Sequence, residues 1–336
     1  MKIILISPPS DFNDQLLGSL QKMPISFKWI NDRESLVIPI PGKFVWKIIR
    51  RIQFLRKFNN KLFHRKVLKM AKTYKPDIII FNKVMIAKKP LLAELSSMGI
   101  KLVNWFPENS GNEPYKSWLE SYASFFDYFF SFDSRIELLN NPSIKTKFFY
   151  LPFGVDLDLF SKVKVTEEER KKYSCDISFV GAYYPEREAI LKELTDFNLR
   201  IYGWKGWENS SLKKYYFGPL NLADSIKVYQ SSKISLNINI LPVINGVNFK
   251  TFEIPASGGF QLSDCRKDLE SLFVVGNEIE VFKDIKELKH KIKYYLDNNL
   301  ERENVIKNSQ KRVSKDHLMS SRLQEIVRVI SSFTIR

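Results

Sequence analysis

Short apolar runs alternate with longer segments of helical spacing along most of the chain. In the first half the apolar runs cover residues 3–6, 77–81, 101–106, 128–132 and 148–151. Two segments between them, 66–74 and 90–98, carry apolar residues at helical intervals. Runs that are apolar on both faces are typical of buried parallel strands, which need a crossover helix between them. The first half is therefore expected to form a parallel α/β sheet.

A second series of the same kind follows Gly154. Expected strands lie at 176–181, 199–203, 234–238 and 259–262, and expected helices at 186–195 and 222–231. The charged segment 163–172 between the two series is interpreted as a linker or a surface helix. The pattern predicts two Rossmann-like α/β halves, in which ligands bind beyond the carboxyl ends of the strands.

Length and charge narrow the class of protein. The chain has 336 residues, enough for two domains of ordinary size. It carries 53 Lys and Arg against 37 Asp and Glu, a formal net charge of +16. This balance favours anionic partners, namely nucleic acid, acidic lipid headgroups or phosphate-bearing substrates, without choosing among them. The two cysteines, Cys175 and Cys265, exclude a disulfide framework and a cysteine-rich zinc site.

The sequence also bears on localisation. Its first apolar run is short, ends at Ser7-Pro8-Pro9, and is interpreted as a strand rather than a signal peptide. No apolar stretch approaches the roughly 18–20 residues that span a bilayer. We expect a cytoplasmic protein that is soluble or rests on the inner face of the cytoplasmic membrane.

The strongest local signal is the segment 245–260. It combines a carboxylate (Glu253), a cation (Lys250), two amides (Asn245 and Asn248) and the pair Gly258-Gly259. An ammonium group neutralises phosphate, glycine lets backbone N–H groups approach phosphate oxygens, and a carboxylate accepts ribose hydroxyls. The set therefore suits a nucleoside diphosphate. The alternative is a helix that ends in an ordinary glycine cap before a strand.

These residues carry a resemblance to a known family. The stretch 247–276 resembles the donor domain of CgeB-like glycosyltransferases and, more broadly, that of retaining glycosyltransferases with the GT-B fold. The matching residues are Asn248, Lys250, Glu253, Ala256, Gly258, Gly259 and Phe260, then Asp264, Leu269, Phe273, Gly276 and Glu278. Shorter pieces agree at 179–181 with Arg187, at 201–207, and at 294–322. The first half matches more weakly, through 75–77, 104–108, 132–133 and 150–154.

The resemblance implies a GT-B fold, with two Rossmann-like domains facing a central cleft. Residues 1–155 would bind the acceptor and 156–318 the nucleotide-sugar donor, while a helix at 319–336 would cross back to the first domain. It further implies a metal-independent, retaining glycosyltransferase that needs no cofactor. This enzyme would move a sugar from a nucleotide sugar to a hydroxyl of a glycan or lipid-linked acceptor in cell-envelope polysaccharide synthesis.

Roles carried over from the family concern the donor. Glu253 would hold the ribose, while Lys250 and Arg187 would face the diphosphate and stabilise the departing nucleotide. Backbone N–H groups of Gly258, Gly259 and Phe260 would lie near phosphate or sugar, and the turn 203–207 would flank the base. The expected donor-binding residues are Gly181, Gly203, Trp204, Asn248, Lys250, Glu253, Ser257, Gly258, Gly259 and Phe260.

Some of these positions also fit a purely structural role, and others depart from the family pattern. Arg187 in a charged helix is alternatively a solvated surface group, and Trp204 and Trp207 are alternatively core residues. Retaining GT-B enzymes often carry two glutamates with seven residues between them, but Asn245 stands at the first of these positions when Glu253 is the second. Lys250 stands where the family more often has arginine, and lysine lacks the bidentate fork.

Acid–base candidates in the first half are Glu108, Glu113, Asp11 and Asp133. Glu108 is the preferred catalytic residue, because it follows the expected strand 101–106 and a carboxylate there could deprotonate an acceptor hydroxyl. Each of the four is alternatively a surface acid. Among the histidines, His64 and His290 are expected at the surface and His317 in a structural role near a helix start. No cluster has the spacing of metal ligands.

A second strong feature is the basic stretch 43–72, which continues without an acidic residue to Lys75. Aromatic and aliphatic residues interleave with its cations at roughly helical spacing. This pattern is typical of a helix that lies on an anionic membrane surface. The alternatives are nucleic-acid binding and an ordinary helix packed on the sheet with a solvated basic face.

Two other function classes compete with the enzyme. One is a non-catalytic nucleotide- or glycan-binding protein on a GT-B scaffold, which the departures at Asn245 and Lys250 favour. The other is a nucleic-acid-binding protein that uses the basic stretch. A donor-hydrolysis assay separates the first rival from the enzyme, and co-purified nucleic acid would favour the second.

Overall fold

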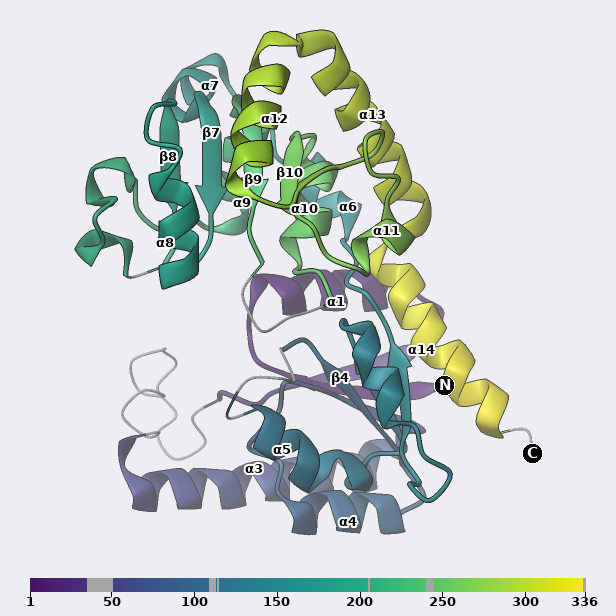
Figure 1. Ribbon diagram of the computed structural model, residues 1–336. Helices are drawn as coiled ribbons and strands as arrows, with labels where there is room; N and C mark the ends of the chain where they lie inside the picture. The colour runs from purple at the N-terminus through teal and green to yellow at the C-terminus, as the bar shows by residue number, and fades with distance from the viewer. Residues whose placement is uncertain (35–50, 109–112, 114, 205, 240–244, 335–336) are drawn as a thin grey trace. The chain divides into compact units, whose positions relative to one another are not determined.

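The protein is represented by a computed structural model that describes residues 1–34, 51–108, 113, 115–204, 206–239 and 245–334. It divides into two compact units, Met1–Leu151 with Ile330–Arg336, and Pro152–Val329 (Figure 1). Parts of three expected features lie outside the described residues, namely 43–50 of the basic stretch, Lys205 of the turn 203–207, and 335–336 of the helix expected at 319–336.

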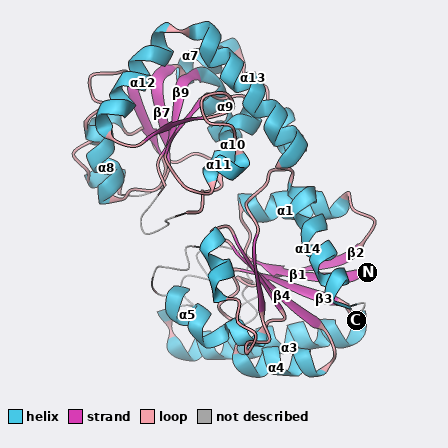
Figure 2. Ribbon diagram, turned by 45° about the vertical axis from the view of Figure 1, so that its right-hand side comes forward, coloured by secondary structure: helices cyan, strands magenta, loops and turns pink. Residues whose placement is uncertain are grey.

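The N-terminal unit is a parallel sheet with helices on both faces. Its strands are β1 (Lys2–Ser7), β2 (Ser26–Asn31), β3 (Ile78–Asn82), β4 (Lys101–Phe106), β5 (Tyr128–Ser131) and β6 (Lys147–Tyr150), in the order β2-β1-β3-β4-β5-β6. Its helices are α1 (Asp11–Gln21), α3 (Gln53–Tyr74), α4 (Lys89–Ser97) and α5 (Tyr115–Tyr122), with 3-10 turns at Ala123–Phe125 and Ser134–Leu139. Figures 1 and 2 show α3, α4 and α5 on one face of the sheet and α1 on the other.

The core of this unit follows from the two structural periods. Alternate strand residues such as Ile4, Ile79 and Leu102 point to the same face of the sheet and are fully buried there. They meet a stripe of α3 in which Phe63 and Val67, four residues apart, are buried. The helical period of α3 thus matches the strand period of the sheet in one apolar layer.

The C-terminal unit is a second parallel sheet. Its strands are β7 (Cys175–Val180), β8 (Leu199–Tyr202), β9 (Ser232–Asn237), β10 (Gln261–Asp264) and β11 (Glu280–Phe282), in the order β11-β10-β9-β7-β8. Its helices are α6 (Leu157–Ser161), α7 (Glu167–Tyr173), α8 (Pro185–Lys192), α9 (Leu222–Ser231), α10 (Lys250–Ser257), α11 (Leu269–Leu272), α12 (Ile285–Asp297) and α13 (Asn299–Asp316), with 3-10 turns at Trp207–Asn209 and Lys213–Tyr215. Helix α14 (Met319–Thr334) begins in this unit, and its residues from Ile330 onward are assigned to the N-terminal unit.

The predicted parallel α/β architecture is confirmed in both units. The charged segment 163–172 contains a surface helix, α7, which begins with a capping box between Thr166 and Glu169. Two strands escaped prediction. β2 is an edge strand whose residues are largely exposed, so it lacks an apolar run, and β11 is only Glu280–Phe282 long.

Both sheets have the same topology. If each unit's strands are renumbered from one, the order is 2-1-3-4-5, with a sixth strand added in the N-terminal unit. The connections leave the first strand on opposite sides, so the crevice at its carboxyl end is a topological switch point. These points lie between β1 and β3 and between β7 and β9, where ligands are expected in sheets of this kind.

Candidate functional site

Helix α10 places the predicted donor residues at its two ends. Lys250 begins the helix on the side where β9 ends, while Ser257 ends it just before β10 starts. Because β9 and β10 are parallel, the two ends of α10 lie at opposite edges of the sheet. The structure therefore separates Ser257, Gly258, Gly259 and Phe260 from Asn248 and Lys250 by the length of the helix.

The two glycines form the cap of α10. Gly258 adopts a left-handed conformation with φ of +83°, and its N–H donates to the Pro255 carbonyl at 2.9 Å. The N–H of Gly259 donates to the Ile254 carbonyl at 3.0 Å. These donors are occupied by the helix end. The glycine cap named as the alternative is therefore present, and the contact of these residues with phosphate stays a prediction.

Phe260 and Ser257 are also accounted for by the fold. The Phe260 ring is buried with its centroid 4.5 Å from that of Tyr295, and its carbonyl accepts from the Ser235 N–H at 2.8 Å. The Ser257 hydroxyl donates to the Glu253 carbonyl at 2.7 Å. Both residues stabilise the helix and the sheet at the edge away from the switch point.

Lys250 and Glu253 form an ion pair on the first turn of α10. The ammonium lies 3.3 Å from Glu253 Oε2 and 5.8 Å from the centre of the Tyr229 ring. Burial lowers the pKa of Lys250, but the facing Tyr229 and Glu253 outweigh this effect and leave its pKa above the ordinary value. The Glu253 side chain is only 6% exposed, against 30% for Lys250. The cation is thus the more accessible partner and stays charged at neutral pH.

A buried polar network holds the segment that leads into α10. Asn248 donates its backbone N–H to Asn239 Oδ1 and its side-chain amide to Asn237 Oδ1, both at 2.8 Å. Asn239 in turn donates to Asp264 Oδ1 at 2.8 Å, and Arg266 Nε donates to Asp264 Oδ2 at 2.8 Å. The network fixes the start of α10 to the carboxyl ends of β9 and β10.

Asn248 keeps one free acceptor within this network. Its Oδ1 is buried and has no hydrogen-bond partner among the residues that the structure describes. Sequence reasoning singled out Asn248 and Asp264 through the resemblance but missed Asn237, Asn239 and Arg266. The available signal was their position, because Asn237 ends a strand and Arg266 follows one.

Arg187 on α8 lies at the same switch point, and its guanidinium bonds backbone carbonyls. Nε and Nη2 donate to the Ile238 carbonyl at 3.0 and 2.7 Å, and Nη1 donates to the Ala182 carbonyl at 3.0 Å. Burial lowers the pKa of Arg187 to about 10, which keeps it charged at neutral pH. The alternative of a solvated surface charge is wrong. Three of its five N–H donors are used to join β9 to the loop after β7.

Gly181 and Gly203 meet where β7 and β8 end. Gly203 has φ of +145°, and a Cβ built there would lie 2.0 Å from the Gly181 carbonyl oxygen. A Cβ on Gly181 would lie 2.8 Å from the Phe179 ring and 3.3 Å from Arg187 Nη1. Gly203 is thus required by the close approach of two backbones, and Gly181 by the side chains packed against it.

The two tryptophans after β8 have different environments. Trp207 is fully buried, and its Nε1 donates to the Gly181 carbonyl at 2.9 Å, so it is a core residue. Trp204 is 67% exposed, so the core alternative is wrong for this residue. An exposed indole at a strand end remains available to stack on a ligand ring.

Glu108 lies in the N-terminal unit, just beyond the end of β4. Its carboxylate pairs with Lys83 at the end of β3, and Lys83 also lies 5.7 Å from the centre of the Tyr115 ring. Of the other acid candidates, Asp133 is buried and bonded to Arg135, Glu113 accepts from Ser117, and Asp11 is exposed. Glu108 and Asp133 therefore both follow strands at the carboxyl edge of the sheet, and each is paired with a cation.

Asp32 is an acid that the sequence analysis missed. It directly follows β2, is only 7% exposed, and its Oδ1 has no hydrogen-bond partner within the described ranges. Burial raises the pKa of Asp32 to about 7, against the lowering effects of Arg33 and Lys83. It was overlooked because β2 was not predicted, and without β2 nothing in the sequence marks Asp32 as a residue that follows a strand.

The three histidines differ from one another. His317 is buried between the Phe252 and Phe273 rings, with Nε2 2.8 Å from the Leu272 carbonyl and Nδ1 2.7 Å from Arg322 Nη2. Burial lowers its pKa to about 4, so the ring is neutral and structural, as expected. His290 is exposed, as expected, whereas His64 is half-buried, with Nε2 3.3 Å from the Ile86 carbonyl.

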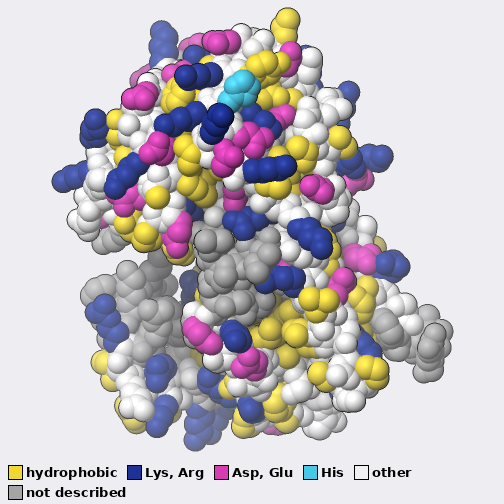
Figure 3. Space-filling model, in the orientation of Figure 1, with side chains coloured by type: hydrophobic (Ala, Val, Ile, Leu, Met, Phe, Trp, Pro, Cys, Tyr) yellow, Lys and Arg dark blue, Asp and Glu magenta, His cyan; other side chains and the backbone are white. Residues whose placement is uncertain are grey.

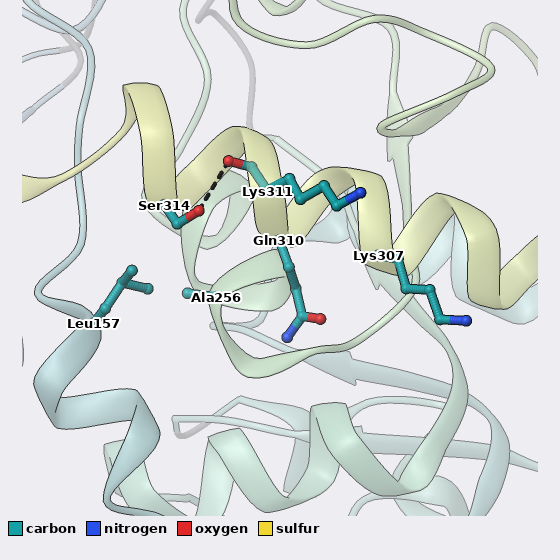
Figure 4. Close-up of a pocket in the computed structure, with 6 residues that line it drawn as sticks. All are labelled: Leu157, Ala256, Lys307, Gln310, Lys311 and Ser314. Carbon is teal, nitrogen blue, oxygen red and sulfur yellow. Dashed lines mark hydrogen bonds between the residues drawn. The ribbon is translucent and has the colours of Figure 1, made fainter.

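A groove of about 400 Å³ opens beside the far end of α10 (Figure 4). Its lining comes from α6, α10 and α13, through Leu157, Ala256, Lys307, Gln310, Lys311 and Ser314. Neither Lys250 nor Glu253 lines it. The groove therefore lies away from the predicted donor residues at the switch point.

The described ranges hold no group of three or more His, Cys, Asp or Glu side chains placed to bind a metal ion. Of the helices that the structure describes, none combines the length and apolar character required to span a bilayer.

Comparison with known proteins gives a family match in the C-terminal unit. Residues 187–328 match a family described as "Glycosyl transferase-like". The matched segment contains Arg187, the network around Asn248, and the Lys250–Glu253 pair. No curated protein matches the sequence.

Solved structures match the whole chain at low sequence identity. Sucrose-phosphate synthase from Thermosynechococcus elongatus has a TM-score of 0.67 at 12% identity, covering 99% of both chains. Anabaena HepE in complex with UDP-glucose has a TM-score of 0.66 at 12% identity, covering 99% of this chain and 100% of that one. A glycosyltransferase from Rickettsia africae has a TM-score of 0.65 at 15% identity, covering 98% and 97%. The chain has the GT-B fold, and the sequence of its C-terminal unit is glycosyl transferase-like.

Proposed function

We propose that the protein is a glycosyltransferase that moves a sugar from a nucleotide-sugar donor to a hydroxyl group. The observation that carries the proposal is the switch point between β7 and β9. There a glycosyl transferase-like sequence places an accessible cation, Lys250, on a helix start held by buried amides. HepE, which shares the fold, has been solved with UDP-glucose, which supports a uridine diphosphate sugar as the first donor to test.

The chemistry proposed for this site is stabilisation of the leaving nucleotide. As the bond between the sugar and the diphosphate breaks, negative charge develops on the phosphate oxygens. The Lys250 ammonium and the helix N-terminus of α10 provide positive charge for it. The free Oδ1 of Asn248 would accept a hydroxyl or N–H group of the donor, and Trp204 would stack on its base.

Glu253 needs a specific account, because its carboxylate faces Lys250. In the proposal it orients the ammonium and accepts a ribose hydroxyl with its remaining oxygen. Arg187, whose guanidinium bonds two backbone carbonyls, holds the loops on both sides of the switch point and adds positive charge there.

The acceptor is proposed to bind the N-terminal unit. Glu108 and Asp32 follow strands of its sheet at the carboxyl edge, and either would orient an acceptor hydroxyl. A glycan or lipid-linked acceptor of cell-envelope polysaccharide synthesis fits the basic stretch, since such acceptors lie at an anionic membrane surface. The resemblance to CgeB-like enzymes favours transfer with retention, without a metal or a cofactor.

The direct test is donor turnover. The protein is incubated with UDP-, GDP-, ADP-, CDP- and dTDP-sugars, and release of the nucleotide is measured with and without simple sugar acceptors. We expect hydrolysis or transfer with one nucleotide class, and loss of both in Lys250→Ala. Absence of binding and turnover with every donor would refute the proposal.

A non-catalytic nucleotide-binding protein is the second candidate, and Asn245 is the observation that favours it. It stands where retaining enzymes often carry the first of two glutamates. Tight nucleotide-diphosphate binding without release of nucleotide from any donor, and without transfer to any acceptor, would establish this candidate.

A further inference from the structure

Helix α3 has two opposite faces of different character. Asn59, Phe63, Val67 and Ala71 recur every four residues and are buried against the sheet. Spacings of three and four residues place a second set on one outward face. This α3 outer face consists of Phe54, Phe58, Lys61, Arg65 and Lys69, all exposed.

The first part of the α3 outer face is aromatic. Phe54 is 73% exposed and Phe58 is 44% exposed. Their rings stack on each other, with centroids 6.4 Å apart and planes 5° from parallel. Two adjacent phenylalanine rings in water are costly, and exposed apolar patches of this kind mark contact surfaces.

The second part is basic. Lys61, Arg65 and Lys69 form no ion pair with any residue that the structure describes, and α3 contains no acidic residue. The remaining acid contacts of α3 are made at its sides, by Lys66 with Glu34 and by Lys72 with Glu94. Figure 3 shows Lys and Arg side chains gathered on the part of the N-terminal unit where α3 runs.

We propose that the α3 outer face docks on a bilayer that contains anionic lipids. Lys61, Arg65 and Lys69 meet the headgroup phosphates, and the Phe54 and Phe58 rings enter the boundary between headgroups and acyl chains. The inference rests on the proposed function in one respect, since docking would bring the enzyme to a lipid-linked acceptor.

The aromatic pair favours a bilayer over nucleic acid. A duplex attracts cations through its phosphates, and Phe54 and Phe58 would gain nothing from that contact. On an anionic bilayer both the aromatic and the basic part of the α3 outer face would contribute to binding, because buried apolar area and positive charge each add to the affinity. The helix is 22 residues long, about 33 Å, so it offers an extended contact parallel to the surface.

The experiment is vesicle flotation of the full chain. Vesicles of phosphatidylglycerol mixed with phosphatidylcholine are compared with pure phosphatidylcholine. We expect binding to the anionic vesicles only, weakened by added salt. The triple variant K61Q/R65Q/K69Q should bind about a hundredfold more weakly, since each cation contributes about fivefold.

Two further variants test whether the face itself is responsible. Lys307, Lys311 and Lys315 on α13 are exposed and equally spaced, so K307Q/K311Q/K315Q makes the same change in net charge elsewhere. We expect it to bind like the wild type. F54S/F58S removes only the exposed rings, should keep the wild-type unfolding temperature, and should bind vesicles at least about tenfold more weakly.

The proposal is overturned if the α13 variant loses as much affinity as the α3 variant, because net charge alone would then explain binding. It is also overturned if F54S/F58S floats like the wild type, or if an oligonucleotide binds more tightly than vesicles whether or not the rings are present. Nucleotide-induced thermal shifts, measured on the same variants, should match the wild type. Their absence in the wild type would contradict the proposed enzyme and leave the docking result standing.

Discussion

The switch points of the two units share a topology and differ in how their polar groups are satisfied. At the switch point between β7 and β9, hydrogen bonds link neighbouring loops: Arg187 donates to the Ile238 carbonyl, Asn248 to Asn237, and Asn239 to Asp264. Asn248 Oδ1 has no partner among the described residues. Around β1 and β3, buried atoms of Asp32, Asn82 and Asn13 have no partner among the described residues. Ser7 does bond Asn13 and Trp29 at the N-terminal edge, but more of the buried polar atoms there are left without a partner among the described residues.

This difference suggests a division of labour. A network that is bonded before the ligand arrives holds its charges where a diphosphate would sit, and little reorganisation is then needed. An edge with unpaired buried groups is stabilised when a ligand supplies the missing hydrogen bonds. This difference agrees with the proposal that the C-terminal unit binds the donor and the N-terminal unit the acceptor.

The largest expected effect concerns Gly203 in the C-terminal unit, where the backbone of Gly181 leaves no room for a side chain. Gly203→Ala would place a Cβ 2.0 Å from the Gly181 carbonyl oxygen, so we expect it to cost more than about 4 kcal/mol of unfolding free energy. Gly99→Ala, with φ of +77° and no atom within 4 Å of its Cβ, should cost about 1 kcal/mol. Urea unfolding measures both, and equal losses would show that the β7–β8 contact is not tight.

The next effect concerns catalysis. Glu253→Gln removes the charge that faces Lys250, and we expect kcat/KM for donor turnover to fall about a hundredfold or more, with the fold retained. Glu278→Gln, which removes a carboxylate paired with Arg312 elsewhere in the same unit, is the matched control and should stay active. If Glu253→Gln kept full activity while Asp32→Asn lost nucleotide binding, the roles assigned to the two switch points would be reversed.

A smaller effect is the response of the units to pH, which should have opposite signs. Asp32 has a folded pKa of about 7, above its unfolded value of about 4, so its stabilising contribution is complete below pH 4 and is lost as pH rises through 7. His317 has a folded pKa of about 4, below its unfolded value of about 6.5, so its contribution is complete above that value and is lost as pH falls.

Hydrogen exchange of the slowest amides in each sheet, corrected for intrinsic rates, gives the free energy of unfolding of each unit. Plotted against pH between about 4 and 7, the two free energies should have slopes of opposite sign. Between these two pH values, each group should change the free energy of unfolding by about 3 kcal/mol. The charges that face these groups are Arg33 and Lys83 for Asp32, and Arg322, Asp316 and Arg312 for His317. Asp32→Asn should abolish the first slope and His317→Gln the second. Slopes of the same sign would contradict the assignment.

The smallest expected effects are at helix caps. Ser10 caps α1 by accepting from the Asn13 N–H, and Thr166 caps α7 within a reciprocal box with Glu169. Ser10→Ala and Thr166→Ala should each lower the unfolding free energy by about 1 kcal/mol. A much larger loss at Ser10 would mean that its hydroxyl supports the switch point as well as the helix.

The sequence predicted the layers of the fold because buried parallel strands are apolar on both faces and therefore conspicuous. It missed β2, whose exposed edge position removes that signature, and β11, which is too short to show one. Asp32 was lost together with β2. A site residue that is recognised by its place after a strand can be found only when the strand is found.

The segment 245–260 shows where sequence reasoning fails within a site. Its composition suits a diphosphate, yet Gly258 and Gly259 close the far end of α10 while Lys250 opens the near end. Lys250 and the two glycines are close in sequence but lie at opposite ends of this helix, and composition does not show where a helix begins and ends. The network through Asn239 and Arg266 escaped for the opposite reason, because its members are distant in sequence and meet only through strand order.

Hydrogen exchange of the full chain with a bound nucleotide tests the central claim most directly. The ligand is whichever of UDP, GDP, ADP, CDP and dTDP raises the unfolding temperature most. We predict protection of the loop after β7 and of the start of α10, around Arg187 and Lys250, with no protection around Asp32. Protection at the N-terminal switch point instead, or no binding of any of the five nucleotides, would contradict the account.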